Sequence, residues 1–327
     1  MAHILQTITK NLILAIPATM VLGFLFGLSA DVRWLRDLII PFTFLMVYPM
    51  MVTLKVRQVF QGGDVKAQAL AQTVNFAVIP FLAWGIGQVF FAQRPFMALG
   101  LLLAGLLPTS GMTISWTGFA KGNVAAAVKM TVIGLVVGSL ATPLYVRALM
   151  GAAIEVDMAA VFLQIGIIVF LPMALGYATQ RLLVRKYGQE TFQKRFGPRF
   201  PPLSTLGVLG IVFVALALKA RTIMQSPEVL LAILAPLVLL YAVNFALSTL
   251  VGRRFLARGD AIAMVYGSVM RNLSIALAVA MNAFGEQGAD AALVVAAAYI
   301  IQVQSAAWYV RLTDRFFGAS AGEPMTA

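Results

Sequence analysis

Two apolar stretches, each long enough to cross a lipid bilayer, carry polar residues at their centres, and this feature limits the possible folds most strongly. The first, 99–120, contains Pro-Thr-Ser-Gly at 108–111, and the second, 261–284, contains Arg-Asn-Leu-Ser at 271–274. Polar or broken backbone at membrane depth is tolerated only where protein or a wet cavity surrounds it. The two stretches therefore predict a transporter whose binding site lies between two interrupted helices.

The composition supports a protein that spans a membrane several times. Apolar residues make up 61% of the 327 residues, charged residues make up 11%, and the mean hydropathy is +0.91. The net charge of +12 could suit nucleic acid, but the basic residues lie in short loops and no nucleic-acid motif accompanies them. With no Cys and one His, His3, we expect no disulfide, no metal site and no cofactor.

Ten apolar segments have about the 20 residues that a transmembrane helix needs. They are 11–30, 36–54, 70–91, 97–119, 124–146, 158–180, 203–220, 228–251, 261–284 and 290–311. We therefore expect an all-α polytopic membrane protein of ten transmembrane helices, in which the fourth and ninth helices are interrupted. The first segment shows no A-x-A cleavage site, and we expect it to be retained as a helix.

The distribution of Lys and Arg predicts the orientation in the membrane. Sixteen of these residues lie on the side of the N-terminus and six on the opposite side, which places both termini in the cytoplasm. We expect the membrane to be the plasma (inner) membrane. The basic loop 181–202 fits this rule, and a patch for anionic lipid is its alternative interpretation. Ten spans divide into two halves of opposite orientation, 1–153 and 154–317, followed by a short cytoplasmic tail, 318–327. Inverted repeats are a common plan of secondary transporters.

Arg271 is the residue that says most about function. It lies near the middle of an apolar span, where an arginine costs about 2.5 to 3.5 kcal/mol on the insertion scale. All twelve acidic residues fall in loops, tails or span ends, so we expect no carboxylate beside it. A buried guanidinium without a carboxylate would bind an anionic ligand. The alternative is an arginine that binds backbone carbonyls of the broken helix or replaces a bound cation.

The first break offers hydroxyl groups and freed backbone groups. Proline removes one backbone donor and glycine loosens the helix, so we predict a polar cup that faces the second break. The candidate substrate-binding residues are Arg271, Asn272, Ser274, Thr109, Ser110, Thr113, Ser268 and Asn75, and the broken-helix backbone is expected at Pro108, Gly111 and Gly267. The alternative is a proline kink whose free backbone groups bind Ser and Thr hydroxyls.

Other polar residues inside the spans are expected to serve the structure. Lys129, about one turn into the fifth span, should extend its ammonium group to the membrane surface. Amide side chains inside spans usually form hydrogen bonds between helices. The amides in question are Gln72, Asn75, Gln164, Asn244, Asn282, Gln302 and Gln304.

Residues at the two breaks also match motifs of a known family. Around the fourth span these are Pro108, Met112, Trp116 and the run Ala-Lys-Gly at 120–122, and in the ninth span the run RNLSIALAVA at 271–280. The chain resembles the bile acid:sodium symporter superfamily, most closely its arsenical-resistance permeases, which export arsenite. The resemblance covers nearly the whole chain. It implies a panel of spans 1, 2, 6 and 7 and a core of spans 3–5 and 8–10, in which the broken helices cross.

The departures from the family pattern fall at the same breaks. Thr109 stands where the arsenite permeases have a cysteine, Arg271 replaces the first asparagine of their pair, and Ser274 replaces their glutamate. In the sodium-coupled branch, Gly267 and Arg271 occupy the positions of a glutamate and a glutamine that bind sodium. The resemblance therefore implies the architecture, but neither coupling scheme.

We predict a secondary-active or facilitative transporter, not an enzyme, that moves a small anion bound near Arg271 by alternating access. Arsenite or antimonite efflux through a site without cysteine is the first alternative. A membrane receptor or sensor without transport is the alternative from another class. An intramembrane enzyme is disfavoured because the predicted spans hold no His, Asp, Glu or Cys at bilayer depth. The expected partners are the lipid bilayer and a small solute, and no protein partner is indicated.

Overall fold

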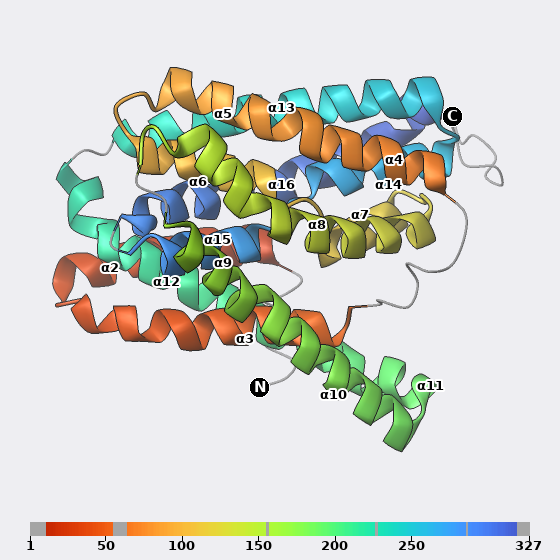
Figure 1. Cartoon of the computed structure of the whole chain (residues 1–327), viewed down its shortest axis with the longest axis horizontal. Helices are drawn as coiled ribbons and strands as arrows, with labels where there is room; N and C mark the ends of the chain where they lie inside the picture. Colours follow the sequence, from red (N-terminus) through yellow and green to blue (C-terminus); the bar gives the residue numbers. More distant parts are fainter. Residues whose placement is uncertain (1–10, 55–63, 155–156, 226–227, 286, 319–327) are drawn as a thin grey trace.

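A computed structural model describes residues 11–54, 64–154, 157–225, 228–285 and 287–318, and its helices run roughly along one common axis (Figure 1). Within these ranges, seven helices are long and apolar enough to cross a membrane, and shorter apolar helices lie at 14–29, 95–106 and 273–283. This agrees with the all-α, membrane-spanning class that the hydropathy predicts.

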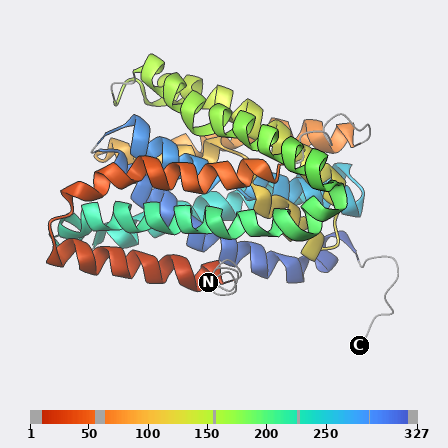
Figure 2. The ribbon, with the colours of Figure 1, turned by 90° about the horizontal axis from the view of Figure 1, so that it is seen from below.

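One group of helices forms a layer that we call the panel. It contains α2 (Leu12–Ser29), η1 (Arg33–Leu38), α3 (Ile39–Val52), α9 (Met158–Ile165), η4 (Gly166–Phe170), α10 (Leu171–Tyr187), α11 (Gln189–Thr191), η5 (Phe192–Phe196), η6 (Gly197–Arg199) and α12 (Phe200–Gln225). Figure 2 shows α2, α12, α3 and α10 side by side. A Cβ atom on Gly23 of α2 would lie 2.5 Å from the Phe213 carbonyl oxygen of α12. Such close backbone packing holds the panel together.

The other helices form a second group, the core. It contains α4 (Val65–Thr73), η3 (Val74–Val78), α5 (Ile79–Phe90), α6 (Pro95–Leu106), α7 (Gly111–Phe119), α8 (Val124–Met150), α13 (Glu228–Phe255), α14 (Arg258–Val269), α15 (Leu273–Ala283) and α16 (Gly288–Phe317). A Cβ atom on Gly100 of α6 would lie 2.5 Å from the Ala291 carbonyl oxygen of α16. Nearly every residue of α6, α14 and α15 is buried. These short helices are therefore enclosed by protein on all sides.

The predicted interruptions are present. The fourth predicted span consists of α6, with 12 residues, and α7, with 9, and the ninth consists of α14, with 12, and α15, with 11. None of these helices has the roughly 20 residues needed to cross a bilayer alone. The breaks, at 107–110 and 270–272, lie deep in the core between the helix halves.

Candidate binding site at the helix breaks

The two breaks lie directly against each other. The Asn272 amide N–H donates a hydrogen bond to the Leu107 carbonyl oxygen (2.8 Å), and Pro108 and Arg271 form an isolated antiparallel β-bridge. Buried backbone groups need partners, and here each broken helix supplies them to the other. The crossing that the family resemblance implied is therefore present in the structure.

At the first break, the hydroxyl groups are bonded to the protein itself. Ser110 is the N-cap of α7 and accepts a hydrogen bond from the Met112 N–H (3.3 Å), while Thr113 Oγ1 accepts one from the Ser110 N–H (3.2 Å). The Ser110 side chain also accepts from the Thr113 backbone N–H, and this bond with the one to Thr113 Oγ1 makes a capping box. Gly111 is the first residue of α7. The cup residues Ser110 and Thr113 thus fix the start of α7.

Thr109 takes an unusual backbone conformation for a β-branched residue, with φ of 65°. Its hydroxyl lies 2.6 Å from the Pro108 carbonyl oxygen, 3.3 Å from that of Met130 and 3.2 Å from that of Thr131. A Cβ atom on Gly134 of α8 would lie 2.6 Å from this hydroxyl oxygen. The side chain therefore faces α8, and its hydroxyl ties the first break to that helix.

At the second break, two asparagines bind the last carbonyl groups of α14. Asn75 Nδ2 donates to the Gly267 carbonyl oxygen (3.0 Å), and Asn244 Nδ2 donates to that of Ser268 (3.0 Å). The final carbonyls of a helix have no partner within it, so these amides replace the missing helical donors. The expectation that Asn244 forms a hydrogen bond between helices is confirmed, and the structure adds that its partner is a carbonyl group at the second break.

The start of α15 is fixed in a similar way. The Asn272 side chain accepts a hydrogen bond from the Ile275 N–H (3.3 Å), which makes it the N-cap. The Ser274 hydroxyl lies 2.6 Å from the Tyr299 hydroxyl of α16. Both predicted residues therefore lie at the crossing, and each already has a protein partner.

Arg271 differs from Asn272 and Ser274 because only its backbone has partners. Its N–H donates to Gln302 Oε1 (2.8 Å), and Gln302 Nε2 donates to its carbonyl oxygen (3.2 Å). The Tyr241 hydroxyl donates to the same Oε1 (2.8 Å). The residue is only 2% exposed, and its Nε, Nη1 and Nη2 have no hydrogen-bond partner among the described residues. A buried charge is costly without a partner, so the guanidinium needs a ligand or water.

Two more polar atoms beside the second break are buried without a partner in the described part of the chain. These are Ser268 Oγ and Asn75 Oδ1. Buried polar atoms in native structures are usually bonded to protein, water or a ligand. With Arg271, they supply a positive charge, a hydroxyl and an amide oxygen at one helix break. Among the described residues there is no cluster of His, Cys, Asp or Glu that could hold a metal ion.

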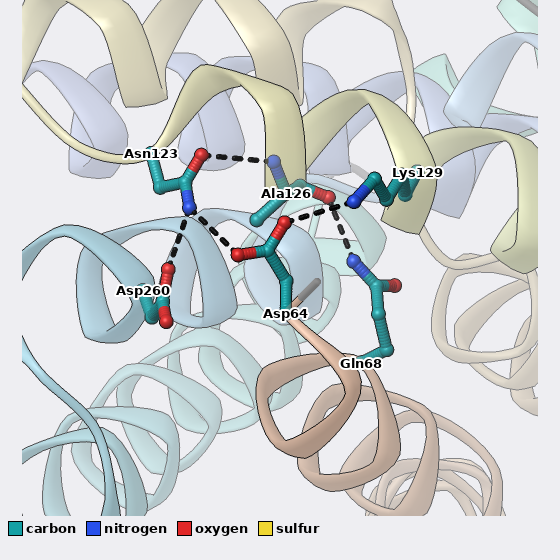
Figure 3. A network of polar contacts seen from close by, with 6 residues as sticks. All are labelled: Asp64, Gln68, Asn123, Ala126, Lys129 and Asp260. Atoms are coloured by element: carbon teal, nitrogen blue, oxygen red, sulfur yellow. Dashed lines mark hydrogen bonds and ion pairs between the residues drawn. The ribbon is translucent and has the colours of Figure 1, made fainter. Parts of the chain in front are cut away.

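A second polar network lies at one end of the core, away from the breaks (Figure 3). Asn123 Nδ2 donates to Asp64 Oδ1 (3.0 Å) and to Asp260 Oδ1 (2.7 Å), while Lys129 Nζ forms an ion pair with Asp64 Oδ2 (3.0 Å). Lys129 is only 4% exposed. The expectation that it extends to the membrane surface is wrong, because Asp64 provides a carboxylate within the protein.

Comparisons with known proteins agree with this architecture. A sequence model of the sodium bile acid symporter family matches residues 40–226. The chain is 26% identical over 220 residues to the uncharacterized protein YbaS of Bacillus subtilis, covering 67% of this chain and 70% of that protein. It is 23% identical to the arsenical-resistance protein Acr3 of Alkaliphilus metalliredigens, over 59% of this chain and 57% of the relative. It is 29% identical to the probable chloroplastic sodium/metabolite cotransporter BASS2 of Oryza sativa, over 53% and 39%.

Proposed function

The chain belongs to the sodium bile acid symporter family, and on that premise we propose that it is a secondary-active or facilitative transporter of a small anion. The observation that supports an anionic substrate is the Arg271 guanidinium, which is buried and without a partner in the described structure. The site lies where two broken helices cross, as is usual for substrate sites of secondary transporters. Neutral hydroxyl and amide groups at the breaks complete the site.

Transport would proceed by alternating access between the panel and the core. In this proposal the chain has ten spans in two inverted halves, 1–153 and 154–317, with both termini in the cytoplasm. The close glycine packing within each group supports two bodies that move as units. The solute site belongs to the core, so movement of the core against the panel would expose it to each side in turn.

Arsenite or antimonite efflux is the second candidate, because two relatives are named arsenical-resistance proteins. A soft thiolate would be the expected ligand for trivalent arsenic, and Thr109 offers a hydroxyl that already lies among three carbonyl oxygens. Cells without their own arsenite exporter should gain tolerance from this gene if that candidate is right. Unchanged sensitivity of cells that make the protein would count against it.

The proposal is tested by binding and then by flux. A ligand that binds the folded state raises its stability, by about 2.7 kcal/mol at 100 times its Kd. We expect small anions to raise the melting temperature of the purified protein, and Arg271→Ala to abolish that shift. Proteoliposomes should then take up the anion that stabilises the protein. Binding without any flux would instead indicate a receptor or sensor.

A further inference from the structure

The charges buried in the core restrict the amount of charge on the ligand as well as its sign. Two charged residues are buried in the described structure, Lys129 and Arg271. Lys129 is paired with Asp64, whereas the Arg271 guanidinium has no partner within the described ranges. The groups that surround the two breaks, among them Ser268, Asn75 and Gln302, are neutral. The binding site thus holds one uncompensated positive charge.

We propose that this site takes one planar, singly charged oxyanion, such as a carboxylate, and that the protein exchanges such anions one for one. The inference rests on the proposed function, because it assumes transport through the site at Arg271. It deepens that function by naming the charge and shape of the substrate and the mode of coupling.

The planar shape of the proposed substrate follows from the geometry of the guanidinium. Its N–H groups form a rigid planar fork that matches the two oxygens of a carboxylate in parallel hydrogen bonds. All three nitrogens are buried and unbonded in the described structure, so the guanidinium has donors left for a bidentate ligand and for one further acceptor. A neutral solute would leave the charge uncompensated. A dianion would leave a net negative charge, because Lys129, the other buried cation of the described residues, is already paired with Asp64.

One-for-one exchange follows from the free-energy cost of moving the core with an empty site. Without an anion, the core carries a bare buried charge, and moving that charge through the middle of the membrane is unfavourable. With a singly charged anion bound, the site is neutral. The loaded core should therefore change sides readily and the empty core slowly, so net uptake is slow and exchange is fast. Sodium has no part in this cycle, and a membrane potential acts on neither loaded step.

The experiment uses the full chain in liposomes, with labelled L-lactate outside and three different internal solutions. L-malate is a matched probe, because it carries a second carboxylate where lactate has only a methyl hydrogen. We expect internal lactate to accelerate lactate uptake roughly tenfold or more over internal buffer, as an unpaired buried charge predicts, and internal malate to have no such effect. Nitrate, a planar inorganic monoanion, replaces internal lactate in a further arm that separates carboxylates from other oxyanions of this charge.

Variants separate the charge of Arg271 from the fold. Arg271→Gln should lose the exchange, and Arg271→Lys should keep the preference for monoanions with weaker affinity, because a lysine lacks the fork. Arg147→Gln, at an exposed arginine in the last turn of α8, is the matched control and should exchange normally. Melting curves of all three variants report whether each one folds.

The outcomes distinguish this inference from the proposed function. Equal uptake into buffer-filled and lactate-filled vesicles, equal exchange with malate, a requirement for sodium, or full exchange by folded Arg271→Gln would each overturn the inference while transport itself stands. If neither lactate nor nitrate binds or moves, while neutral arsenite does, the anion transporter proposal fails together with the inference. Fast, sodium-independent exchange restricted to monoanions supports both.

Discussion

At the scale of single residues, the site depends on how Arg271 is held. Its position within an apolar span was readable from the sequence, because a charge at that depth is rare and has few explanations. The residue that binds its backbone, Gln302, could not be predicted, because it lies 31 residues further along the chain and amides in spans are common. Pairing between residues far apart in the chain is decided by packing, which a single sequence does not show.

Replacement of Gln302 by Leu should therefore damage both the fold and the site. It removes three hydrogen bonds, and it leaves the N–H and carbonyl of Arg271 and the Tyr241 hydroxyl without their partner. Because a buried unsatisfied group costs about 1 to 3 kcal/mol, we expect a clear fall in melting temperature and a smaller stabilisation by anions. Gln304→Leu, a half-buried neighbour on the same helix, is the control. Equal melting curves for the two variants would contradict this role of Gln302.

Thr109 gives a second prediction at this scale. Its hydroxyl lies among carbonyl oxygens of both the first break and α8, so Thr109→Val should destabilise the protein by about 1 to 2 kcal/mol. Thr109→Ser keeps the hydroxyl without the branched Cβ that makes a positive φ unfavourable, and it should be at least as stable as the parent. Thermal unfolding in detergent measures both variants. A valine variant as stable as the serine variant would show that the hydroxyl is dispensable.

At the scale of helices, hydropathy predicted the all-helical, membrane-spanning class and the two places where apolar helices are interrupted. Proline, glycine and polar residues at 108–111 and 271–274 were sufficient to predict the breaks, because an intact helix would bury those groups unfavourably. The π-helical turns η3 and η4 were not predicted, since each is one turn inside an apolar helix with no distinct composition. The pairing of Lys129 was missed because Asp64 lies before α4, outside the apolar spans.

The network in Figure 3 ties the starts of three helices together, and it should contribute measurably to stability. Asp64→Asn removes the carboxylate from a buried ammonium, which costs about 2 to 4 kcal/mol for a partly buried pair. Asparagine tolerates the positive φ of 59° at this position, so the change isolates the charge. Glu190→Gln, in the exposed pair with Lys194, is the matched control and should change stability by less than about 0.5 kcal/mol.

The double variant Asp64→Asn with Lys129→Met tests the same pair from the other side. Loss of both charges should restore part of the stability, because an apolar side chain of similar length needs no counter-charge. Melting temperatures of the two single variants and the double variant give the coupling between the residues. Simple addition of the two single effects would mean that the ion pair contributes nothing on its own.

At the scale of the whole molecule, close backbone packing holds the panel and the core together internally, whereas polar side-chain contacts are among those that join the two groups. The tightest glycine contacts lie within one group or the other. Polar contacts that cross between the groups include the ion pair of Lys219 with Asp290 (2.8 Å) and the hydrogen bond from Asn282 to Thr43 (3.1 Å). Both lie toward the end where α3 and α16 begin, on the left in Figure 1. The proposed movement of the core against the panel would break these contacts.

The chain contains no cysteine, so introduced thiols are the only ones present. Thr43→Cys with Asn282→Cys places two thiols where a hydrogen bond now joins panel and core. Oxidation to a disulfide should stop anion exchange in proteoliposomes, and reduction should restore it, because a covalent link prevents the two groups from separating. The single variants, treated with the same oxidant, should keep exchanging. Continued exchange by the fully cross-linked protein would mean that the core does not move against the panel at this end.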